Sequence, residues 1–337
     1  FTHGVETASF HKTQRNTAWR VSDLDANLVG ANSSSFNKYF CIFHGGNEYL
    51  NCGSDASLDL EEFTISAWIN FDSTMESFAS GGIMALGGGI KNRTFYVWGT
   101  GSSRILGYHS EYDSTDAIWK LFSQPISSNT WYHVALTHFA ASGEAAADRS
   151  QPKMYINGVE YSPQEHLVPA GNLENTAGAH YIGRSYSSAI AGGAGSSGEG
   201  AGHYYKGFID EVSVWDTRLS AGEIGRLYRN ETLQQVANGP NDLADHPKYS
   251  NLVSWWRMGD HPNDDTNRIG FVQTVRDNKG TNHAEGHLDG GGVLYNPQYY
   301  IDGGNEQWSG STFQHPDLHV YCENTNFEHE ILWLTMS

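Results

Sequence analysis

The chain is short of basic residues and has no long apolar run. Its 20 Lys and Arg face 38 Asp and Glu, which leaves a formal net charge of −18. A negative field of this size repels nucleic-acid backbones and anionic membrane surfaces, so the sequence argues against both as partners. No apolar stretch approaches the roughly 20 residues that cross a bilayer, which argues against membrane insertion.

Cysteine and the common catalytic motifs are also scarce. The three cysteines are Cys41, Cys52 and Cys322, and no C-x-x-C spacing occurs, so a zinc site is not predicted. One disulfide with one free thiol, or three free thiols, are both open. The chain also lacks the H-E-x-x-H metal motif, a phosphate-binding loop and the G-x-S-x-G nucleophile motif.

Glycine and aromatic residues are abundant instead. The chain has 38 Gly but only 9 Pro, and it lacks long helical patterns, which is typical of many short strands joined by glycine-rich turns. Residues 63–71 alternate with period two, which predicts a strand. Its apolar face would consist of Phe63, Ile65, Ala67, Ile69 and Phe71.

Turn and cap signals punctuate the strand-like runs. Gly45-Gly46 and Asn157-Gly158 each separate two apolar runs, which predicts two hairpins. Ser220-x-x-Glu223 is a capping box and predicts a helix over about 221–229. Because strand-like runs recur about every 8–15 residues, the sequence predicts an all-β fold built as a two-sheet antiparallel sandwich.

The chain divides into three parts. Residues 1–36 are polar and weakly patterned, and we expect an N-terminal extension that packs on a body or a partner. Residues 37–232 form the strand-rich domain, within which 187–202 has no side chains able to build a core and predicts a surface loop. Residues 233–337 predict a C-terminal β-rich extension packed on the sandwich.

A carboxylate interrupts one apolar strand. Strict alternation places Asp210 on the same face as Phe208, Val212 and Val214, the side that a strand usually buries. A buried carboxylate without a partner costs several kcal/mol, so something must satisfy it. A cation could do so, and so could backbone N–H groups or an arginine.

Five motifs follow one another between Tyr39 and Tyr228. They are "NEYLNCGSDASLDLEEFTISAWINF", "WYHVALTH", "KMYINGVEY", "YIGRS" and "YKGFIDEVSVWDTRLSAGEI". Their order resembles the laminin-G-like family of the concanavalin A-like jelly-roll superfamily. Residues 251–288 also resemble a "WWRMGD…DN-G-N" phrase that accompanies such domains in marine phage and environmental structural proteins. The resemblance implies a jelly-roll sandwich with one concave and one convex sheet, here with strand-containing extensions at both ends.

The resemblance also implies a structural calcium ion. In the superfamily the aspartate that matches Asp210 often ligates calcium, with backbone oxygens from an early hairpin. In this sequence that hairpin would be Gly45-Gly46-Asn47, so Asp210, Gly45 and Asn47 are the predicted ligands. A carboxylate and turn carbonyls supply the oxygen ligands that calcium prefers.

The glucanases of the superfamily carry E-x-D-x-x-E on one strand, which this chain only approaches. Glu111, Asp113 and Asp116 stand at the matching spacing, but in a polar tip and with Asp at the last position. Retaining hydrolysis needs two carboxyl groups about 5–5.5 Å apart. We therefore assign no catalytic residue and predict a solvated turn, with a second cation site as the alternative.

Four aromatic residues lie in consecutive predicted strands and their connecting tip. A sugar-binding surface needs aromatic faces and polar groups side by side, and the alternative is that these rings pack in the core. The predicted ligand-binding residues are Trp98, Tyr108, Tyr112, Trp119, Asp113 and Asp116.

These observations predict a non-enzymatic, lectin-like binding or adhesion module, extracellular or on a virion surface. Its expected partners are glycans and either other copies of itself, as a repeating subunit, or a particle or surface protein. The alternative from another class is a purely structural virion or extracellular subunit without glycan binding. A glucanase-like hydrolase is the third hypothesis. Glycan binding would separate the first hypothesis from the second.

Overall fold

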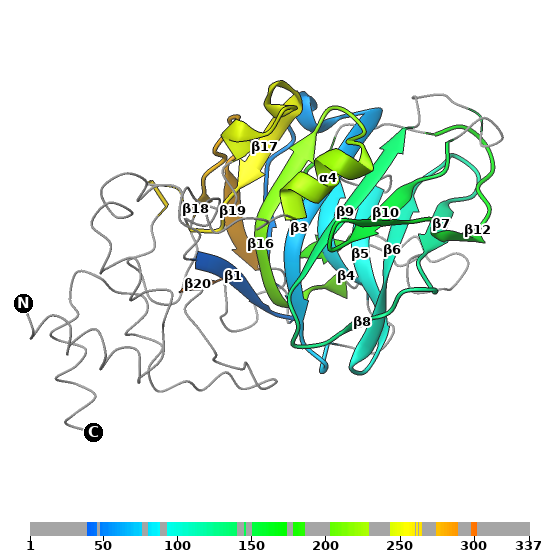
Figure 1. Ribbon diagram of the computed structural model, residues 1–337, viewed down its shortest axis with the longest axis horizontal. Coiled ribbons are helices and arrows are strands. Elements are labelled where there is room, and N and C mark those ends of the chain that lie inside the picture. The colour runs from blue at the N-terminus through cyan, green and yellow to red at the C-terminus, as the bar shows by residue number, and fades with distance from the viewer. Residues whose placement is uncertain are drawn as a thin grey trace, which may run out of the picture.

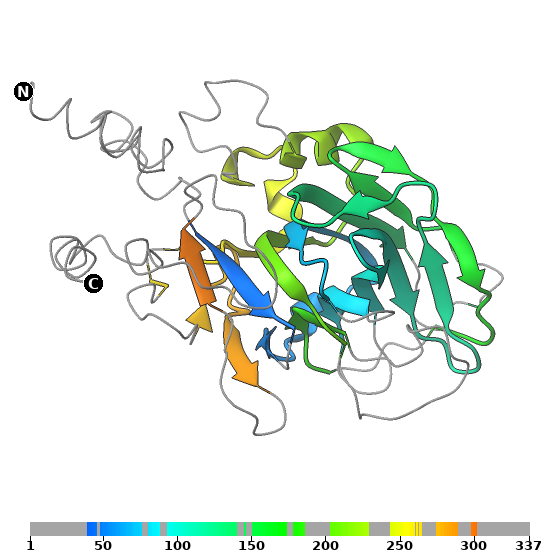
Figure 2. The same ribbon diagram turned by 90° about the horizontal axis from the view of Figure 1, so that it is seen from below.

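Alternating apolar residues build two antiparallel sheets that face each other across one core (Figures 1 and 2). The computed structural model describes residues 39–45, 48–75, 80–87, 93–139, 145, 150–173, 178–185, 203–228, 243–259, 261, 263–264, 274–288 and 298–301. The all-β sandwich predicted from the sequence is confirmed. Within these ranges, no helix combines the length and the apolar character needed to cross a bilayer.

The first sheet has eight strands. Its order is β11 (Val159–Tyr161), β10 (Lys153–Ile156), β9 (Tyr132–Phe139), β3 (Glu62–Phe71), β16 (Lys206–Trp215), β1 (Tyr39–His44) and β20 (Gln298–Ile301), and β17 (Leu252–Trp256) also pairs with β16. Asn157 and Gly158 both have positive φ angles between the paired strands β10 and β11, so the hairpin predicted there is confirmed.

The second sheet has ten strands. Its order is β12 (Gln164–Leu167), β7 (Ala117–Lys120), β6 (Ser103–Ser110), β5 (Arg93–Thr100), β4 (Ser80–Leu86), β13 (Tyr181–Ile182), β2 (Glu48–Asn51), β19 (Ala284–Leu288) and β18 (Thr274–Val275), and β8 (Ile126–Ser127) pairs with β6. The short strands β14 (Arg184–Ser185) and β15 (His203–Tyr204) pair with each other. The 3-10 turns are η1 (Ala56–Leu58), η3 (Leu243–Asp245) and η4 (Tyr249–Asn251).

The hairpin predicted at Gly45-Gly46 is wrong. Strand β1 pairs with β16 and β20 in the first sheet, whereas β2 pairs with β13 and β19 in the second. The chain therefore changes sheets between His44 and Glu48. A glycine pair marks a sharp change of direction, but it does not say whether the next strand returns beside the last one.

The core lies between the sheets. The predicted apolar face of β3 is confirmed, since all five of its side chains are fully buried there. The two phenylalanines and two isoleucines each stabilise the fold by roughly 1.5–3 kcal/mol relative to an exposed position. From the second sheet they meet Phe95, Val97, Leu106, Tyr108 and Trp119, among others. Cys41 and Cys52 are buried free thiols in this core, and burial raises the pKa of both.

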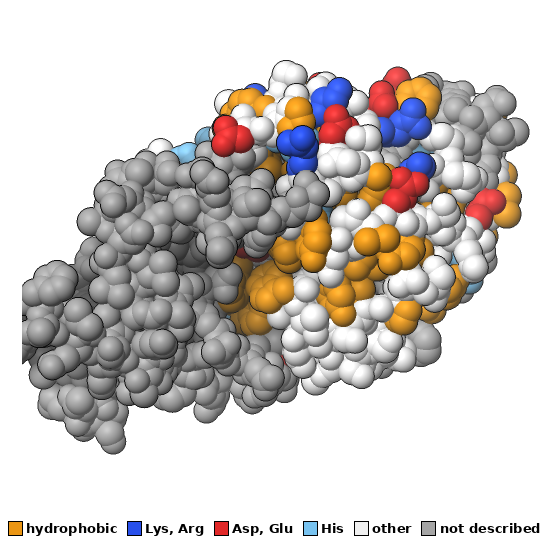
Figure 3. Space-filling model, in the orientation of Figure 1, with side chains coloured by type: hydrophobic (Ala, Val, Ile, Leu, Met, Phe, Trp, Pro, Cys, Tyr) orange, Lys and Arg blue, Asp and Glu red, His pale blue; other side chains and the backbone are white. Residues whose placement is uncertain are grey.

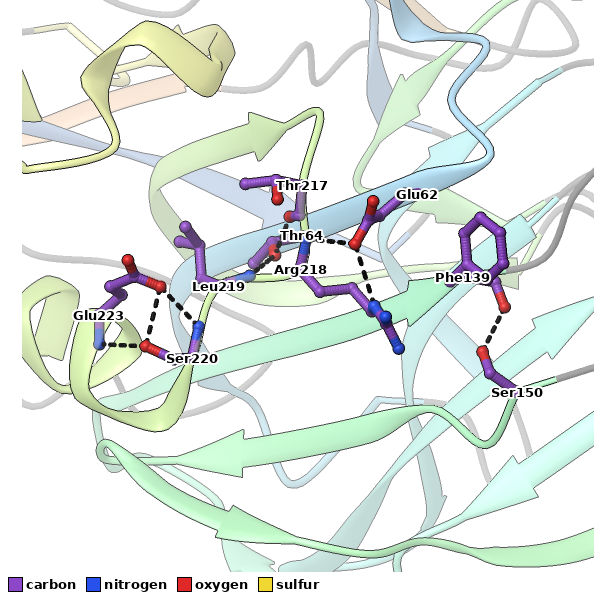
Figure 4. A network of polar contacts seen from close by, with 9 residues as sticks. All are labelled: Glu62, Thr64, Phe139, Ser150, Thr217, Arg218, Leu219, Ser220 and Glu223. Carbon is purple, nitrogen blue, oxygen red and sulfur yellow. Dashed lines mark hydrogen bonds and ion pairs between the residues drawn. The ribbon is translucent and has the colours of Figure 1, made fainter.

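Helix α4 (Ala221–Tyr228) begins at the predicted capping box (Figure 4). The Ser220 backbone N–H donates to Glu223 Oε2 over 2.7 Å, and the Glu223 N–H donates to Ser220 Oγ over 3.4 Å. These reciprocal bonds satisfy backbone N–H groups that the first helical turn leaves open. The helix packs on the outer face of the first sheet through Ile224 and Leu227, over Trp215 (Figure 1).

The described part of the C-terminal extension continues both sheets. Strand β17 joins β16, β18 and β19 extend the second sheet beyond β2, and β20 lies beside β1 (Figure 2). Asp277 organises the turn before β19, because its carboxylate accepts the backbone N–H groups of Trp255, Lys279 and Asn282. These strands therefore take part in the sandwich as sheet members. Residues 1–36, the predicted N-terminal extension, and 187–202, the predicted surface loop, lie outside the described residues.

A bulge in β16 overturns the predicted face of Asp210. Pairing of β16 with β3 shifts between Asp210 and Ser213, and Glu211 adopts a φ of 48°. Phe208 accordingly packs on the outer face of the first sheet, whereas Val212 and Val214 face the core between the sheets. The bulge adds one residue and changes the side on which every later side chain points. The carboxylate of Asp210 accepts the Glu211 N–H over 2.7 Å at this bulge.

The bulge places a second carboxylate, Glu211, against the C-terminal extension. Its Oε1 lies 3.2 Å from Arg257 Nε, and both side chains are almost fully buried. Trp255 Nε1 donates to the other carboxylate oxygen. The guanidinium of Arg257 also lies 4.9 Å from the ring centroid of Trp255. This network joins the middle of β16 to β17.

The outer face of the first sheet also carries an aromatic group. Phe40, Phe208 and Trp131 pack together, with the Phe40 and Phe208 centroids 4.8 Å apart. Hydrophobic side chains are visible on this side of the molecule, which is also the side of α4 (Figure 3). Trp131 is partly exposed, whereas both phenylalanines are buried.

Replacing Arg257 by Met should destabilise the protein by about 3–5 kcal/mol, because it leaves the Glu211 carboxylate buried without its counter-charge. Urea denaturation measures the effect. The control is Lys153→Met, which removes an exposed ion pair to Glu160 and should cost less than about 1 kcal/mol. Equal losses in the two variants would contradict a stabilising role for the buried pair.

Candidate functional site

The outer face of the second sheet brings polar and aromatic side chains together. Tyr96 on β5 pairs with Gly107 on β6, and Gly107 pairs with Lys120 on β7, so the three lie in one row across the sheet. Gly107 leaves room for the Tyr96 ring, since a Cβ there would lie 2.3 Å from Tyr96 Cζ. Trp98 follows Tyr96 on the same face of β5.

We define the Lys120 cluster as Tyr96, Trp98 and Lys120. The ammonium of Lys120 lies 3.7 Å from the ring centroid of Trp98, which is a close cation–π contact. Tyr96 and Lys120 are fully buried, whereas Trp98 is partly exposed. A buried amine and a buried phenol therefore lie beside an indole that reaches the surface.

Among the described residues, the side-chain polar atoms of Lys120 and Tyr96 have no hydrogen-bond partner. Lys120 Nζ and the Tyr96 hydroxyl are both buried without a partner. Burial lowers the pKa of the Lys120 ammonium to about 8 and raises the pKa of Tyr96. Because buried polar groups are normally hydrogen-bonded, two such groups in one row make this cluster a candidate ligand site.

Exposed side chains lie next to this cluster. His166 on β12 is exposed, and burial together with the charge of Lys120 lowers its pKa. The ring of Phe122 stands 6.0 Å from that of His166, and 43% of Phe122 is exposed. The buried ammonium is thus near the surface, and these side chains were not anticipated from the sequence.

A second group on the same face consists of His109, Glu111 and Asp116, which we call the acid–histidine cluster. Its three potential ligand atoms lie within 4.8 Å of one another. His109 Nε2 is 3.2 Å from Asp116 Oδ2, and the imidazole is fully buried. This spacing would allow the three side chains to share a divalent cation, because metal–ligand bonds of about 2.0–2.6 Å span it.

In the segment that approaches the glucanase motif, the structure separates Asp113 from the other two carboxylates. Glu111 and Asp116 join His109, whereas Asp113 accepts the Asn172 backbone N–H over 2.9 Å and holds the neighbouring loop. Alternation along β6 and β7 could have grouped Glu111 and Asp116 with His109. The bridges between this tip and residues 170–173 come only from tertiary structure.

Three of the four aromatic residues predicted to form a sugar-binding surface lie in the core, so that prediction is wrong for these three. Tyr108 and Trp119 are fully buried and stack on each other with centroids 5.4 Å apart, and Tyr112 is 5% exposed. They alternate with Gly107, Lys120 and Glu111, which take the outer face. Only Trp98 of the four faces outward.

The predicted calcium ligands do not converge. Cys41 pairs with Ile209, so Phe40 lies opposite Asp210 and Gly45 is five positions farther along β1, about 16 Å away at a rise of about 3.3 Å per residue. Gly45 therefore cannot share an ion with Asp210, and Asn47 lies outside the described residues. Calcium beside Asp210 stays a prediction, and it would need other oxygen ligands.

The family follows from a match over residues 44–225 to the concanavalin A-like lectin/glucanases superfamily. The chain belongs to this superfamily. No curated protein matches it. The matched region ends within α4, so the strands β17 to β20 lie beyond it.

Several solved structures resemble the superfamily fold of this chain. A candidate carbohydrate-binding protein from Bacteroides ovatus matches with a TM-score of 0.46 and 18% identity over 79% of this chain and 60% of its own. A heptameric SAP-like pentraxin from Limulus polyphemus has a TM-score of 0.34 and 15% identity, over 59% and 79%. The Ruminococcus gnavus sialidase module CBM40, bound to α2,3-sialyllactose, has a TM-score of 0.38 and 16% identity, over 56% and 96%.

Chelation should reveal any structural cation and, with two variants, its place. An ion that binds only the folded state at 100 times its Kd adds about 2.7 kcal/mol, so a chelator should lower the melting temperature. Asp210→Asn should remove this sensitivity if the ion lies beside Asp210. Glu111→Gln should remove it if the ion lies in the acid–histidine cluster. A melt that a chelator does not change would contradict both sites.

Proposed function

We propose that this chain is a non-enzymatic carbohydrate-binding module whose ligand lies on the outer face of the second sheet. The observation that carries the proposal is the Lys120 cluster, where two buried donors without hydrogen bonds lie beside a partly exposed tryptophan. Membership of the lectin/glucanase superfamily supports the same ligand class.

The cluster matches the chemistry of a sugar. The face of Trp98 can pack on the apolar C–H face of a pyranose ring, while sugar oxygens can accept hydrogen bonds from Lys120 and Tyr96. Such a ligand would restore the hydrogen bonds that burial has removed from these two side chains. The first sheet is less suited to this role, because α4 covers part of its outer face.

Binding is favoured over hydrolysis by the environment of the carboxylates. Glu111 is 6% exposed, and Asp116 accepts the Tyr112 backbone N–H and lies against His109. These contacts fit side chains that shape a loop or hold a cation better than a general acid and a nucleophile facing a substrate.

We also propose where the module acts. Laminin-G-like domains usually act outside cells, so we place the protein in the extracellular space or on a virion surface. Assembly as a repeating subunit, adhesion, and contact with a particle or surface protein stay predictions.

Removing the indole of Trp98 tests the binding face. Trp98→Ala should weaken the binding of any glycan that the wild-type protein retains by about tenfold, equal to about 1.4 kcal/mol, in calorimetric titration after a glycan array. The control is Trp131→Ala, which removes a partly exposed tryptophan from the other sheet and should leave affinity unchanged. Loss of binding in the control alone would move the ligand to the first sheet.

Hydrolytic activity should be absent, because Glu111 is buried and Asp116 is engaged by His109 and the Tyr112 backbone N–H, so the two do not face a substrate as a general acid and a nucleophile. Incubation with laminarin, agar or carrageenan should release no reducing ends above a blank. Turnover that disappears in Glu111→Gln would overturn the non-enzymatic part of the proposal.

A further inference from the structure

We propose that the Lys120 cluster selects anionic saccharides, with the Lys120 ammonium facing a carboxylate or sulfate group of the sugar. This inference deepens the proposed function and depends on it. Its basis is a cation that is fully buried, carries no hydrogen bond and has no carboxylate partner among the described residues. The shared ligand chemistry is an oxyanion on a sugar ring.

The isolation of Lys120 is unusual for this composition. Acidic residues outnumber basic ones by 38 to 20, so most lysines have carboxylates available. Lys153 shows the usual arrangement, with its ammonium 2.7 Å from Glu160. Lys120 instead has the indole of Trp98 as its contact. A position that keeps a cation away from an abundant supply of carboxylates is suited to an external anion.

The cation–π contact does not use all the N–H donors of Lys120. An ammonium group has three N–H donors, and one aromatic face cannot accept them all. The Tyr96 ring ends over Gly107, the residue between Tyr96 and Lys120 in the row, and its hydroxyl adds a second unsatisfied donor. One oxyanion can accept from both groups, whereas a neutral hydroxyl would leave the ammonium charge uncompensated.

We expect a ligand to reach Lys120 through movement of side chains. Lys120 carries its charge on a flexible four-carbon stem, and the neighbouring His166 and Phe122 are surface side chains. The titratable side chains on the same face are Tyr96 from β5, His109 from β6 and His166 from β12, together with the carboxylates of Glu111 and Asp116 from the tip between β6 and β7. Protonation of His166 would add positive charge and strengthen anion binding at low pH.

The charge of Lys120 sets the pH dependence. Burial lowers the pKa of the ammonium to about 8, so the side chain is charged below that pH and loses its charge above it. Affinity for an anionic sugar should therefore be high below pH 8 and fall as the pH rises through it. An anionic ligand would favour the charged form and move this loss to higher pH.

Matched saccharide pairs test the inference. We would titrate the full chain with neutral agarose oligosaccharides, sulfated carrageenan oligosaccharides and carboxylated alginate oligosaccharides at pH 6.5 and 9.5. The wild-type protein should prefer one anionic class over agarose by about 10- to 100-fold at pH 6.5, the range expected of a charge-assisted hydrogen bond. The preferred class distinguishes sulfate from carboxylate.

Two substitutions isolate the charge. Lys120→Met keeps the length of the stem and should abolish the anionic preference, whereas Lys120→Arg should retain it at pH 9.5, because arginine stays charged. Lys153→Met is the control that removes an exposed lysine and should change nothing. If Lys120→Met fails to fold, the pH response of the wild-type protein compared with Lys120→Arg decides the question.

Different results would overturn anionic selection and glycan binding. Equal affinity for neutral and anionic sugars, unchanged in Lys120→Met, would overturn the anionic selection and leave glycan binding intact. An anionic preference that persists in Lys120→Met and at pH 9.5 would also overturn it, because another cation would then be responsible. The absence of binding to any saccharide, neutral ones included, would overturn the proposed function itself.

Discussion

The bulge at Asp210 and Glu211 is the constraint on which the first sheet depends. Strand β16 is central, since it pairs with β1, β3 and β17. One added residue lets Ile209 and Val212 both face the core while the two acidic side chains between them stay out of it. Without the bulge, strict alternation would bring a carboxylate into the sandwich, at a cost of several kcal/mol.

The bulge also creates a need for the residues after α4, because they supply the partner of a buried carboxylate. Glu211 is buried and needs a counter-charge, which Arg257 supplies from just beyond β17. Asn282, which lies just before β19 of the second sheet, donates to Ser254 of β17 and to Ser57 of the turn η1, and so ties this region to both. The polar network thus couples segments far apart in sequence, and it extends the sandwich past the region that matches the superfamily.

The second sheet contains buried polar side chains that have no hydrogen-bond partner within the described part of the chain. Around β16 buried charges are paired, whereas Lys120 and Tyr96 are left without hydrogen bonds. The fold must offset this cost elsewhere, and the dense aromatic core beneath, where Tyr108 stacks on Trp119, is the stabilising layer. A local loss of stability of this kind is characteristic of a binding site.

The sequence by itself determined the fold class, the buried face of β3, the hairpin at Asn157-Gly158 and the cap of α4, because each depends on side chains close together in the chain. The tertiary structure decided the rest. The chain changes sheets between His44 and Glu48, the register of β1 places Gly45 too far from Asp210 to share an ion with it, and the bulge reversed the faces of β16. Alternation showed that Trp98 and Trp119 lie on strands, but it could not say which face was inside. That choice depends on which side meets the other sheet, and only long-range packing sets it.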